Sequence, residues 1–377
     1  MRRTPRLLAG IVLVLLALGL VMLASASSVK GDASKNDPGY FLKRQAIWLA
    51  VAVVAGVVAA KVDYHYWQKA WIPLALLSGF LLTMVMVPGL RLKINGACRW
   101  FRMGPFSFQP SELAKIAVVV MLSAWMTRCG VRSLRFRDGV LKPLAMLAVF
   151  LALVIMEPDY GTTILLGAVG VGILYVGGAR SWQLALPCLV GGVCIAYLIS
   201  LDPVRLGRIV AFIDPEQNPK VAYHLAQSKT SFMLGGLRGV GLGNSLQKHF
   251  YLPEAHTDFI LSIIGEELGL VATLGVVLLF AGYVICGMRI ALKAPDSFGR
   301  LTAFGLTMMV GLQAFINGGV VTGILPTKGL PLPFISYGGS SLIMSLVATG
   351  ILINIARHTA SGGDTPTRAV KDRAKTL

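Results

Sequence analysis

The chain has 377 residues, of which 55% are hydrophobic and 14% are charged, and its mean hydropathy is +0.71. A soluble core cannot hide so large an apolar share, whereas membrane-spanning helices of about 20 residues each can. The composition therefore excludes an ordinary soluble protein and predicts an all-α polytopic membrane protein. The net charge of +18 includes the Lys and Arg bias of cytoplasmic loops, so we expect no nucleic-acid partner.

Ten apolar segments are predicted to span the membrane. The first follows several arginines, yet it is too long for the apolar region of a signal peptide, so we expect an uncleaved helix. The ten segments are residues 7–27, 46–62, 71–87, 112–127, 143–156, 161–178, 182–201, 260–291, 301–323 and 337–356.

The distribution of Lys and Arg predicts the orientation. Basic segments at the N-terminus, at residues 128–142 and at residues 357–375 fall on one side of an even number of spans, which predicts that both termini are cytoplasmic. Residues 1–357 then form one membrane domain, and residues 358–377 form a disordered cytoplasmic tail. The longest polar segment, residues 202–258, connects spans seven and eight and is predicted to be a large extracytoplasmic loop.

A short outer loop, residues 89–111, is unusually basic. It holds Arg91, Lys93, Arg99 and Arg102 and no acidic residue, although such charges resist translocation. These cations either meet anionic membrane lipids and carboxylates of other loops, or they form an anion site, because guanidinium groups suit phosphate and pyrophosphate. The larger outer segment adds further cations, among them Arg208.

Two other features carry less information. The run at residues 235–243 has five glycines but lacks the Lys-Ser ending of a nucleotide-binding loop, so surface turns are the better interpretation. The cysteines show neither CxxC nor Cys/His ligand spacing, and we expect no disulfide and no structural zinc.

Residues 251–260 place a charge at the edge of an apolar segment. Asp258 is costly to desolvate there, so it is either a first-turn residue that favours the helix dipole, with Thr257 as the cap, or a residue with a chemical role. His256 lies two positions earlier, which is weak evidence for a metal site. Glu266 and Glu267 fall below the surface and require partners.

Other charges also lie at span ends. Glu112 and Lys115 are three positions apart and can pair on one helix face. Glu157 and Asp159 flank Pro158, which ends the fifth span, and they either terminate the helix or line a substrate cavity. Lys328 lies in a proline- and glycine-rich stretch, residues 326–341, that predicts a non-helical segment at membrane depth.

Taken together, these motifs resemble the SEDS family (shape, elongation, division and sporulation). The Pro-Thr-Lys-Gly sequence that contains Lys328 is most similar to the division branch, and the sporulation branch stays open as well. The matching motifs run in the order of the family at residues 95–100, 108–115, 157–162, 241–245, 251–259, 265–269 and 326–341.

The resemblance implies a peptidoglycan glycosyltransferase of the bacterial cell membrane. Such an enzyme polymerises lipid II at the division septum, together with a class B penicillin-binding protein and other divisome membrane proteins. Asp258 matches the family's essential aspartate, and our hypothesis is that it is the general base on the acceptor 4-hydroxyl in an inverting transfer that releases undecaprenyl pyrophosphate.

The remaining candidate residues would bind this substrate. Cations or a divalent metal ion, Mg²⁺ or Mn²⁺, would stabilise the leaving pyrophosphate, and no residue is assigned as a metal ligand. The predicted substrate-binding residues are Arg99, Lys115 and Lys328, then Arg102 and Arg208, with Glu112, Glu157, Asp159 and His256.

Two other functions compete with an enzyme. A lipid II flippase would use the same cations and membrane groove, but it would require an alternating-access pathway, and the sequence shows no convincing internal repeat. A non-enzymatic divisome scaffold would not explain the basic outer loop. Comparing polymerisation by the wild type and by Asp258→Asn separates these interpretations.

Overall fold

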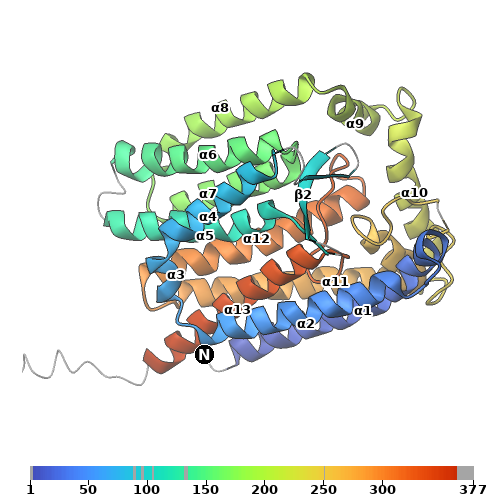
Figure 1. Cartoon of the computed structure of the whole chain (residues 1–377), viewed down its shortest axis with the longest axis horizontal. Coiled ribbons are helices and arrows are strands. Elements are labelled where there is room, and N and C mark those ends of the chain that lie inside the picture. Colours follow the sequence, from blue (N-terminus) through green and yellow to red (C-terminus); the bar gives the residue numbers. More distant parts are fainter. Residues whose placement is uncertain are drawn as a thin grey trace, which may run out of the picture.

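The computed structural model describes residues 3–87, 91–94, 97–103, 106–130, 135–249 and 251–362 as a bundle of long helices (Figure 1). Each of the ten predicted segments coincides with a helix. These ten are α1 Thr4–Lys35, α2 Tyr40–Lys61, α4 Trp71–Met84, α5 Pro110–Cys129, α6 Lys142–Met156, α7 Tyr160–Val176, α8 Ser181–Ser200, α11 Ile260–Leu292, α12 Ser297–Val321 and α13 Gly339–Gly362. The shorter helices are α3 His65–Lys69, the π-helix η2 Arg137–Leu141, α9 Pro203–Ile213 and α10 Pro219–Gly235.

Within the described part of the chain, seven helices are long and apolar enough to cross a membrane, which makes the protein a polytopic helical membrane protein. They are α1, α2, α8, α11, α12, α13 and the continuous η2–α6 segment, whereas α4 and α7 are shorter apolar helices. The predicted total of ten spans, and the side of the membrane that each loop faces, stay predictions.

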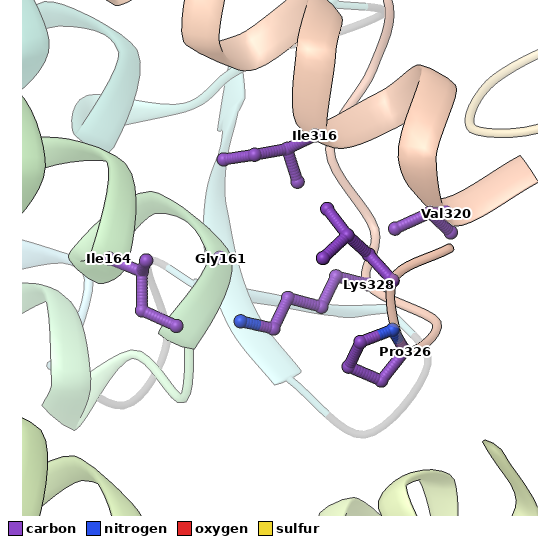
Figure 2. A pocket seen from close by; sticks show the side chains of 7 residues that line it. Gly161, Ile164, Ile316, Val320, Pro326 and Lys328 are labelled. Atoms are coloured by element: carbon purple, nitrogen blue, oxygen red, sulfur yellow. The ribbon is translucent and has the colours of Figure 1, made fainter. Parts of the chain in front are cut away.

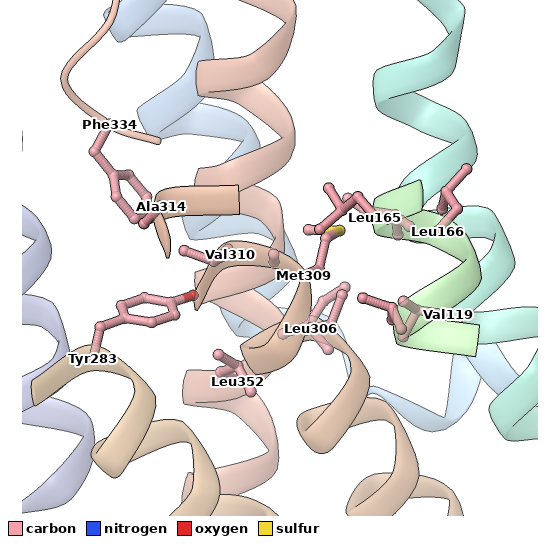
Figure 3. Packing of buried hydrophobic residues seen from close by; sticks show 14 of the residues in the cluster. Val119, Leu165, Leu166, Tyr283, Leu306, Met309, Val310, Ala314, Phe334 and Leu352 are labelled. Atoms are coloured by element: carbon pink, nitrogen blue, oxygen red, sulfur yellow. The ribbon is translucent and has the colours of Figure 1, made fainter. Parts of the chain in front are cut away.

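The centre of the bundle is formed by α5 and α12. Most of α5 is buried, because other helices surround it. Figure 3 shows side chains of α12, among them Leu306 and Met309, packed between Leu165 of α7 and Leu352 of α13. Helix α8, by contrast, lies at the periphery, and its main contacts among the described helices are with α7 and α9. Within α8, only Gln183 and Leu184 are buried.

Small residues allow a close contact between α2 and α13. A Cβ added at Gly350 of α13 would lie 2.2 Å from the Gly56 carbonyl oxygen of α2. Close backbone approach at paired small residues is a common way to associate helices where lipid removes the hydrophobic driving force. Glycines therefore fix the α2–α13 contact.

The expectation of an all-α protein missed a small sheet. Strands β1 Arg91–Ile94, β2 Ala97–Met103 and β3 Phe106–Phe108 form an antiparallel sheet in the order β1-β2-β3. Phe101 pairs with both Arg91 and Phe108. The described part of the predicted basic outer loop is thus held by backbone pairing between strands. This pairing fixes the backbone position of Arg99 in β2.

Helix α11 is broken at Gly269, and the glycine-rich run fills the break. Gly269 has φ 78° and ψ −175°, which interrupts the helical hydrogen bonds. The freed carbonyls of Glu266 and Glu267 accept from Val240 N and Gly241 N at 2.9 and 3.0 Å. On the other side of the break, Leu270 N donates to Gly236 O at 2.9 Å. Residues 236–243 form mostly exposed turns and bends, as predicted, and in addition their backbone docks into the break of α11.

The two buried glutamates have partners from residues 245–248, shortly after this segment, and from α1. Glu266 accepts from Ser245 Oγ at 2.6 Å and from Leu246 N at 2.7 Å. Glu267 pairs with Lys248 at 3.3 Å and accepts from Ser25 Oγ of α1 at 2.6 Å. Because both charges are buried, these bonds offset part of their desolvation and tie the glycine-rich segment to two helices.

The sheet, α9, α10 and residues 236–259 and 322–338 gather at one end of the bundle, which we call the loop end (Figure 1). The start of α1 and the end of α13 lie at the other end, as an even number of spans requires. Helix α13 continues to Gly362, five residues past the predicted domain boundary at 357. Residues 363–377 lie outside the described part, so the predicted disorder of the tail stays a prediction.

Replacing Gly269 with Ala should destabilise the fold. A Cβ at this position would lie 2.5 Å from Gly239 N, and a positive φ adds strain of about 1–3 kcal/mol for a residue with a side chain. Thermal unfolding in detergent should show a lower Tm. The matched control is Gly275→Ala in the same helix, where a Cβ meets no described atom within 4 Å. Equal Tm values for the two variants would contradict the docking of residues 235–243.

Candidate functional site

Asp258 lies at the loop end, just before α11. Helix α11 begins at Ile260 after Phe259, it has no acidic residue in its first turn, and no described side chain caps it. Thr257 donates instead to the Glu254 carboxylate at 2.9 Å. The helix-dipole role for Asp258 and the capping role for Thr257 were therefore wrong.

The non-helical segment 322–338 holds the backbone around Asp258. A non-helical segment was predicted at residues 326–341; the structure has it at 322–338, because α13 already begins at Gly339. Ser336 Oγ donates to Thr257 O at 2.6 Å, and Tyr337 N donates to His256 O at 3.1 Å. A Cβ added at Gly329 would lie 2.8 Å from Asp258 Oδ2. A side chain at position 329 would therefore displace the Asp258 carboxylate from where it lies.

The surroundings of Asp258 favour its protonated form more than water does. Burial raises the pKa of the Asp258 carboxyl to about 7, the Glu254 carboxylate adds to the rise, and the guanidinium groups of Arg99 and Arg208 oppose it. The residue nevertheless keeps intermediate solvent exposure, so a substrate can reach it. A carboxyl with a pKa near neutrality is suited to accept a proton from a hydroxyl group.

Arg99 and Arg205 converge on the turn between α6 and α7. Arg99 donates to Glu157 O at 3.1 Å and to Pro158 O, and it lies 3.8 Å from Asp159. Arg205 of α9 donates to the same Pro158 carbonyl at 2.8 Å and pairs with Asp202. The two arginines therefore connect the sheet, the turn and α9.

Arg208 completes a cluster of like charges. Its side chain is exposed, but the surrounding protein atoms partly desolvate it and lower its pKa; the cations of Arg205 and Arg99 lower it further, and the carboxylates of Asp258 and Asp202 oppose the change. Three mutually repelling guanidinium groups beside a carboxyl are costly to assemble and would be stabilised by a bound anion. Arg205 was missed as a site residue, although its position three residues before Arg208 in the predicted outer loop was a usable signal.

Lys328 lines an apolar pocket between α7 and α12. The pocket has a volume of about 200 Å³ and is lined by Gly161, Ile164, Ile316, Val320, Leu325, Pro326 and Lys328. Figure 2 shows the Lys328 side chain crossing it toward Ile164. A single cation in apolar walls fits an anionic group attached to a hydrocarbon chain.

Glu112 and Lys115 form the predicted pair, but beneath the site. Their side chains lie 2.8 Å apart with 5% and 2% exposure, and Lys115 also donates to Gln313 Oε1 of α12 at 2.7 Å. With so little exposure, neither side chain reaches an open surface. The geometry favours the structural interpretation, a buried ion pair, over direct substrate contact.

Glu157 and Asp159 are also buried, and they differ in their partners. Asp159 accepts from Thr162 N and Thr162 Oγ1 at 3.2 and 2.9 Å, so it caps α7. Neither carboxyl oxygen of Glu157 has a hydrogen-bond partner among the described residues. Burial raises the pKa of Glu157 to about 8, Asp159 adds to the rise, and Arg99 opposes it. Glu157 therefore carries a proton at neutral pH.

Of the last two predicted substrate-binding residues, His256 and Arg102, only His256 has a described side chain. His256 is buried and packs against Phe41 and Tyr337, with ring centroids 4.9 and 5.9 Å away. Burial lowers its pKa to about 4, and Lys30 contributes, so the ring is neutral. Arg102 pairs with Ser107 in the sheet, but its side chain lies outside the described part.

The comparisons with known proteins identify the family. The model of the FtsW/RodA/SpoVE family of cell cycle proteins matches residues 5–361. The chain belongs to this family. Proteins named probable peptidoglycan glycosyltransferase FtsW from Trichlorobacter lovleyi and Thioalkalivibrio sulfidiphilus are 42% and 43% identical to it, over 92% and 93% of this chain and 91% and 89% of theirs.

Solved structures of the family have the same fold. A chain from a peptidoglycan synthase complex, described as coordinating polymerization and crosslinking, superposes with a TM-score of 0.77 at 26% identity. The superposition covers 93% of this chain and 97% of that one. The rod shape determining protein RodA of Thermus thermophilus gives a TM-score of 0.69 at 26% identity over 93% and 96% of the two chains.

The structural role of the buried pair can be tested by breaking it. Lys115→Met leaves the Glu112 carboxylate buried without its cation, which should cost about 3–5 kcal/mol of stability. The double variant Glu112→Leu/Lys115→Met should recover most of the Tm in detergent, because it removes both charges. A stable Lys115→Met protein that fails only to bind substrate would contradict the structural interpretation.

Proposed function

We propose that this chain is a peptidoglycan glycosyltransferase that polymerises lipid II during septal wall synthesis. The observation that carries the proposal is the carboxyl of Asp258 beside a cluster of arginines, next to an apolar pocket that contains Lys328. Lipid II combines a sugar hydroxyl, a pyrophosphate and a polyprenyl chain, and each of the three has a chemical counterpart here. The FtsW relatives support the division role.

In this mechanism Asp258 acts as the general base. Its carboxylate takes the proton of the acceptor GlcNAc 4-hydroxyl, and the oxygen attacks the anomeric carbon of the donor from the face opposite the pyrophosphate. The bond from that carbon to the pyrophosphate oxygen breaks with inversion, and its electron pair leaves with the undecaprenyl pyrophosphate. The proton on Asp258 then passes to water.

The cations stabilise the charge that develops on the leaving group. Arg208 is exposed and lies within electrostatic range of Asp258, and Lys328 lies in the adjoining pocket. Arg99 is partly engaged by the α6–α7 turn and contributes mainly through its field. Fixed cations at a water-poor site commonly give the largest share of transition-state stabilisation.

The proposed setting follows from the same function. The enzyme works in the bacterial cell membrane with both termini in the cytoplasm and the loop end outside, where lipid II is polymerised. We propose a class B penicillin-binding protein and other divisome membrane proteins as partners. The resemblance to a chain of a synthase complex supports the first of these.

Asp258→Asn should reduce polymerisation by about 10²–10⁴-fold, because the amide cannot accept the proton. The wild-type rate should also fall tenfold per unit as the pH drops below about 7, since a base must be deprotonated and the pKa of Asp258 is raised to about 7. The assay is glycan ladder formation from lipid II, with and without the class B partner.

The control for Asp258→Asn is Glu216→Gln, which removes an exposed carboxylate between α9 and α10. It should keep the wild-type rate. Ladders from both Asp258→Asn and the wild type would remove Asp258 from the base role. If neither protein makes ladders with any partner, the flippase or scaffold function is favoured instead.

A divalent cation is proposed to enter with the pyrophosphate rather than to occupy a protein-built site. Among the described residues, no three His, Cys, Asp or Glu side chains are grouped to hold a metal ion. Mg²⁺ usually binds through one or two carboxylates and the phosphates of the substrate. Chelation should therefore slow polymerisation and added Mg²⁺ or Mn²⁺ should restore it, while the dialysed protein retains no metal. Stoichiometric metal in the dialysed protein would contradict this proposal.

A further inference from the structure

Asn317 joins the two segments that form the site. It lies in α12, is 2% exposed, and its Nδ2 donates to Asp258 O and to Leu330 O, each at 2.8 Å. The orientation of the amide follows from these acceptors, because turning it over would place Oδ1 against two carbonyl oxygens. One side chain thus fixes the distance between the Asp258 backbone and segment 322–338.

Gln313 repeats the pattern one turn earlier. Its Nε2 donates to Pro331 O at 2.8 Å, and its Oε1 accepts from Lys115 at 2.7 Å. Residues four positions apart lie on the same helix face. Two amides of α12 therefore form a ladder that runs from the Glu112–Lys115 pair, along Pro331 and Leu330, to Asp258.

Asn317 is an expensive choice for stability alone. A buried amide in an apolar helix is costly, and its Oδ1 has no hydrogen-bond partner among the described residues. An apolar residue of similar size would avoid that cost if the helix only had to pack. Such an apolar residue could not, however, donate hydrogen bonds to the carbonyls of Asp258 and Leu330 and so hold them at a fixed distance.

That distance decides where the carboxylate lies. Gly329 comes directly before Leu330, and its backbone leaves so little room that a Cβ would lie 2.8 Å from Asp258 Oδ2. Asn317 therefore clamps the segment on which the Asp258 side chain rests and also the backbone from which it projects. A displacement of about 1 Å at a reacting group can cost about 10²-fold in rate.

We infer that Asn317 is a positioning residue for the catalytic carboxylate: by bonding Asp258 O and Leu330 O it holds Asp258 at the distance from segment 322–338 that the reaction requires. The inference rests on the proposed function, and it assigns Asn317 no contact with the substrate. Gln313 supports the same segment from one turn below.

The test compares steady-state polymerisation by Asn317→Ala and Asn317→Ser with the wild type, per folded molecule. Asn317→Ala should lower kcat by about 10²-fold with KM for lipid II within about threefold, because Arg99 and Arg208 are held by β2 and α9 and only Lys328 lies on the clamped segment. Asn317→Ser keeps one donor and should give an intermediate rate. If Asn317→Ala does not survive purification, the same measurements on Asn317→Ser decide.

The pH profile supplies a readout that lost stability does not move. Asp258 faces Glu254, Arg99, Arg208 and Asp159, and none of these charges is removed by the substitution. Loosening the backbone should expose the carboxyl to water and shift the acidic limb of kcat to lower pH. A loss of folded protein would lower the amplitude of the profile without shifting that limb.

Asn354 provides the matched control. It is a buried asparagine of α13 that donates to Ala60 O at 3.0 Å and accepts from Tyr64 N at 3.0 Å, at the end of the bundle opposite the site. Asn354→Ala should lower Tm but leave kcat per folded molecule and the pH profile unchanged. If the wild type polymerises and Asn317→Ala equals it in kcat and pH profile, the inference fails alone. If the wild type makes no glycan, the proposed function fails together with the inference.

Discussion

The structure depends on pairing every backbone polar group that lies away from water. Gly269 breaks α11 among apolar neighbours, and the break is tolerable only because residues 235–243 supply the missing donors and acceptors. The same requirement applies to segment 322–338, whose carbonyls at Leu330 and Pro331 accept from side chains of α12. Irregular backbone therefore occurs where a neighbouring helix has amide side chains, or a glycine break, that can form hydrogen bonds with it.

These irregular segments are what create the site. In a regular helix the backbone carbonyls already accept hydrogen bonds from the same helix, so they are not free to bond to a loop. Because α11 starts at Ile260, Asp258 belongs to a loop whose backbone is bonded by α12 and by Ser336. The carboxylate is thus placed by rigid elements although it lies outside them, which is a common arrangement for reactive groups.

Much of the helical scaffold could be predicted from the sequence, because apolar length alone marks a membrane helix. The Glu112–Lys115 pair was also predicted, and so was most of the non-helical segment, since spacing and proline content are local signals; the predicted bounds, 326–341, ran three residues into α13. The sheet at residues 91–108 was missed because pairing depends on a partner strand rather than on the residues themselves.

The site was harder to predict than the scaffold. Asp258 was found through its motif, but its environment depends on residues far away in the chain, such as Asn317 and Gly329. An asparagine inside an apolar span was a signal that could have been used. The glycine-rich run forms the predicted turns, but its docking into α11 was missed because the break in α11 is invisible in a pattern of apolar residues.

The protonated Glu157 changes the charge inventory of the loop end. By sequence, the α6–α7 turn has two carboxyl groups, Glu157 and Asp159, that could balance the positive charge of the neighbouring arginines. With the pKa of Glu157 near 8, this carboxyl is mostly protonated at neutral pH, and the Asp159 carboxyl is already engaged by Thr162. The turn therefore neutralises less of the arginine charge than the sequence suggests. Above pH 8 Glu157 would ionise, and the loop end would lose part of its attraction for phosphate.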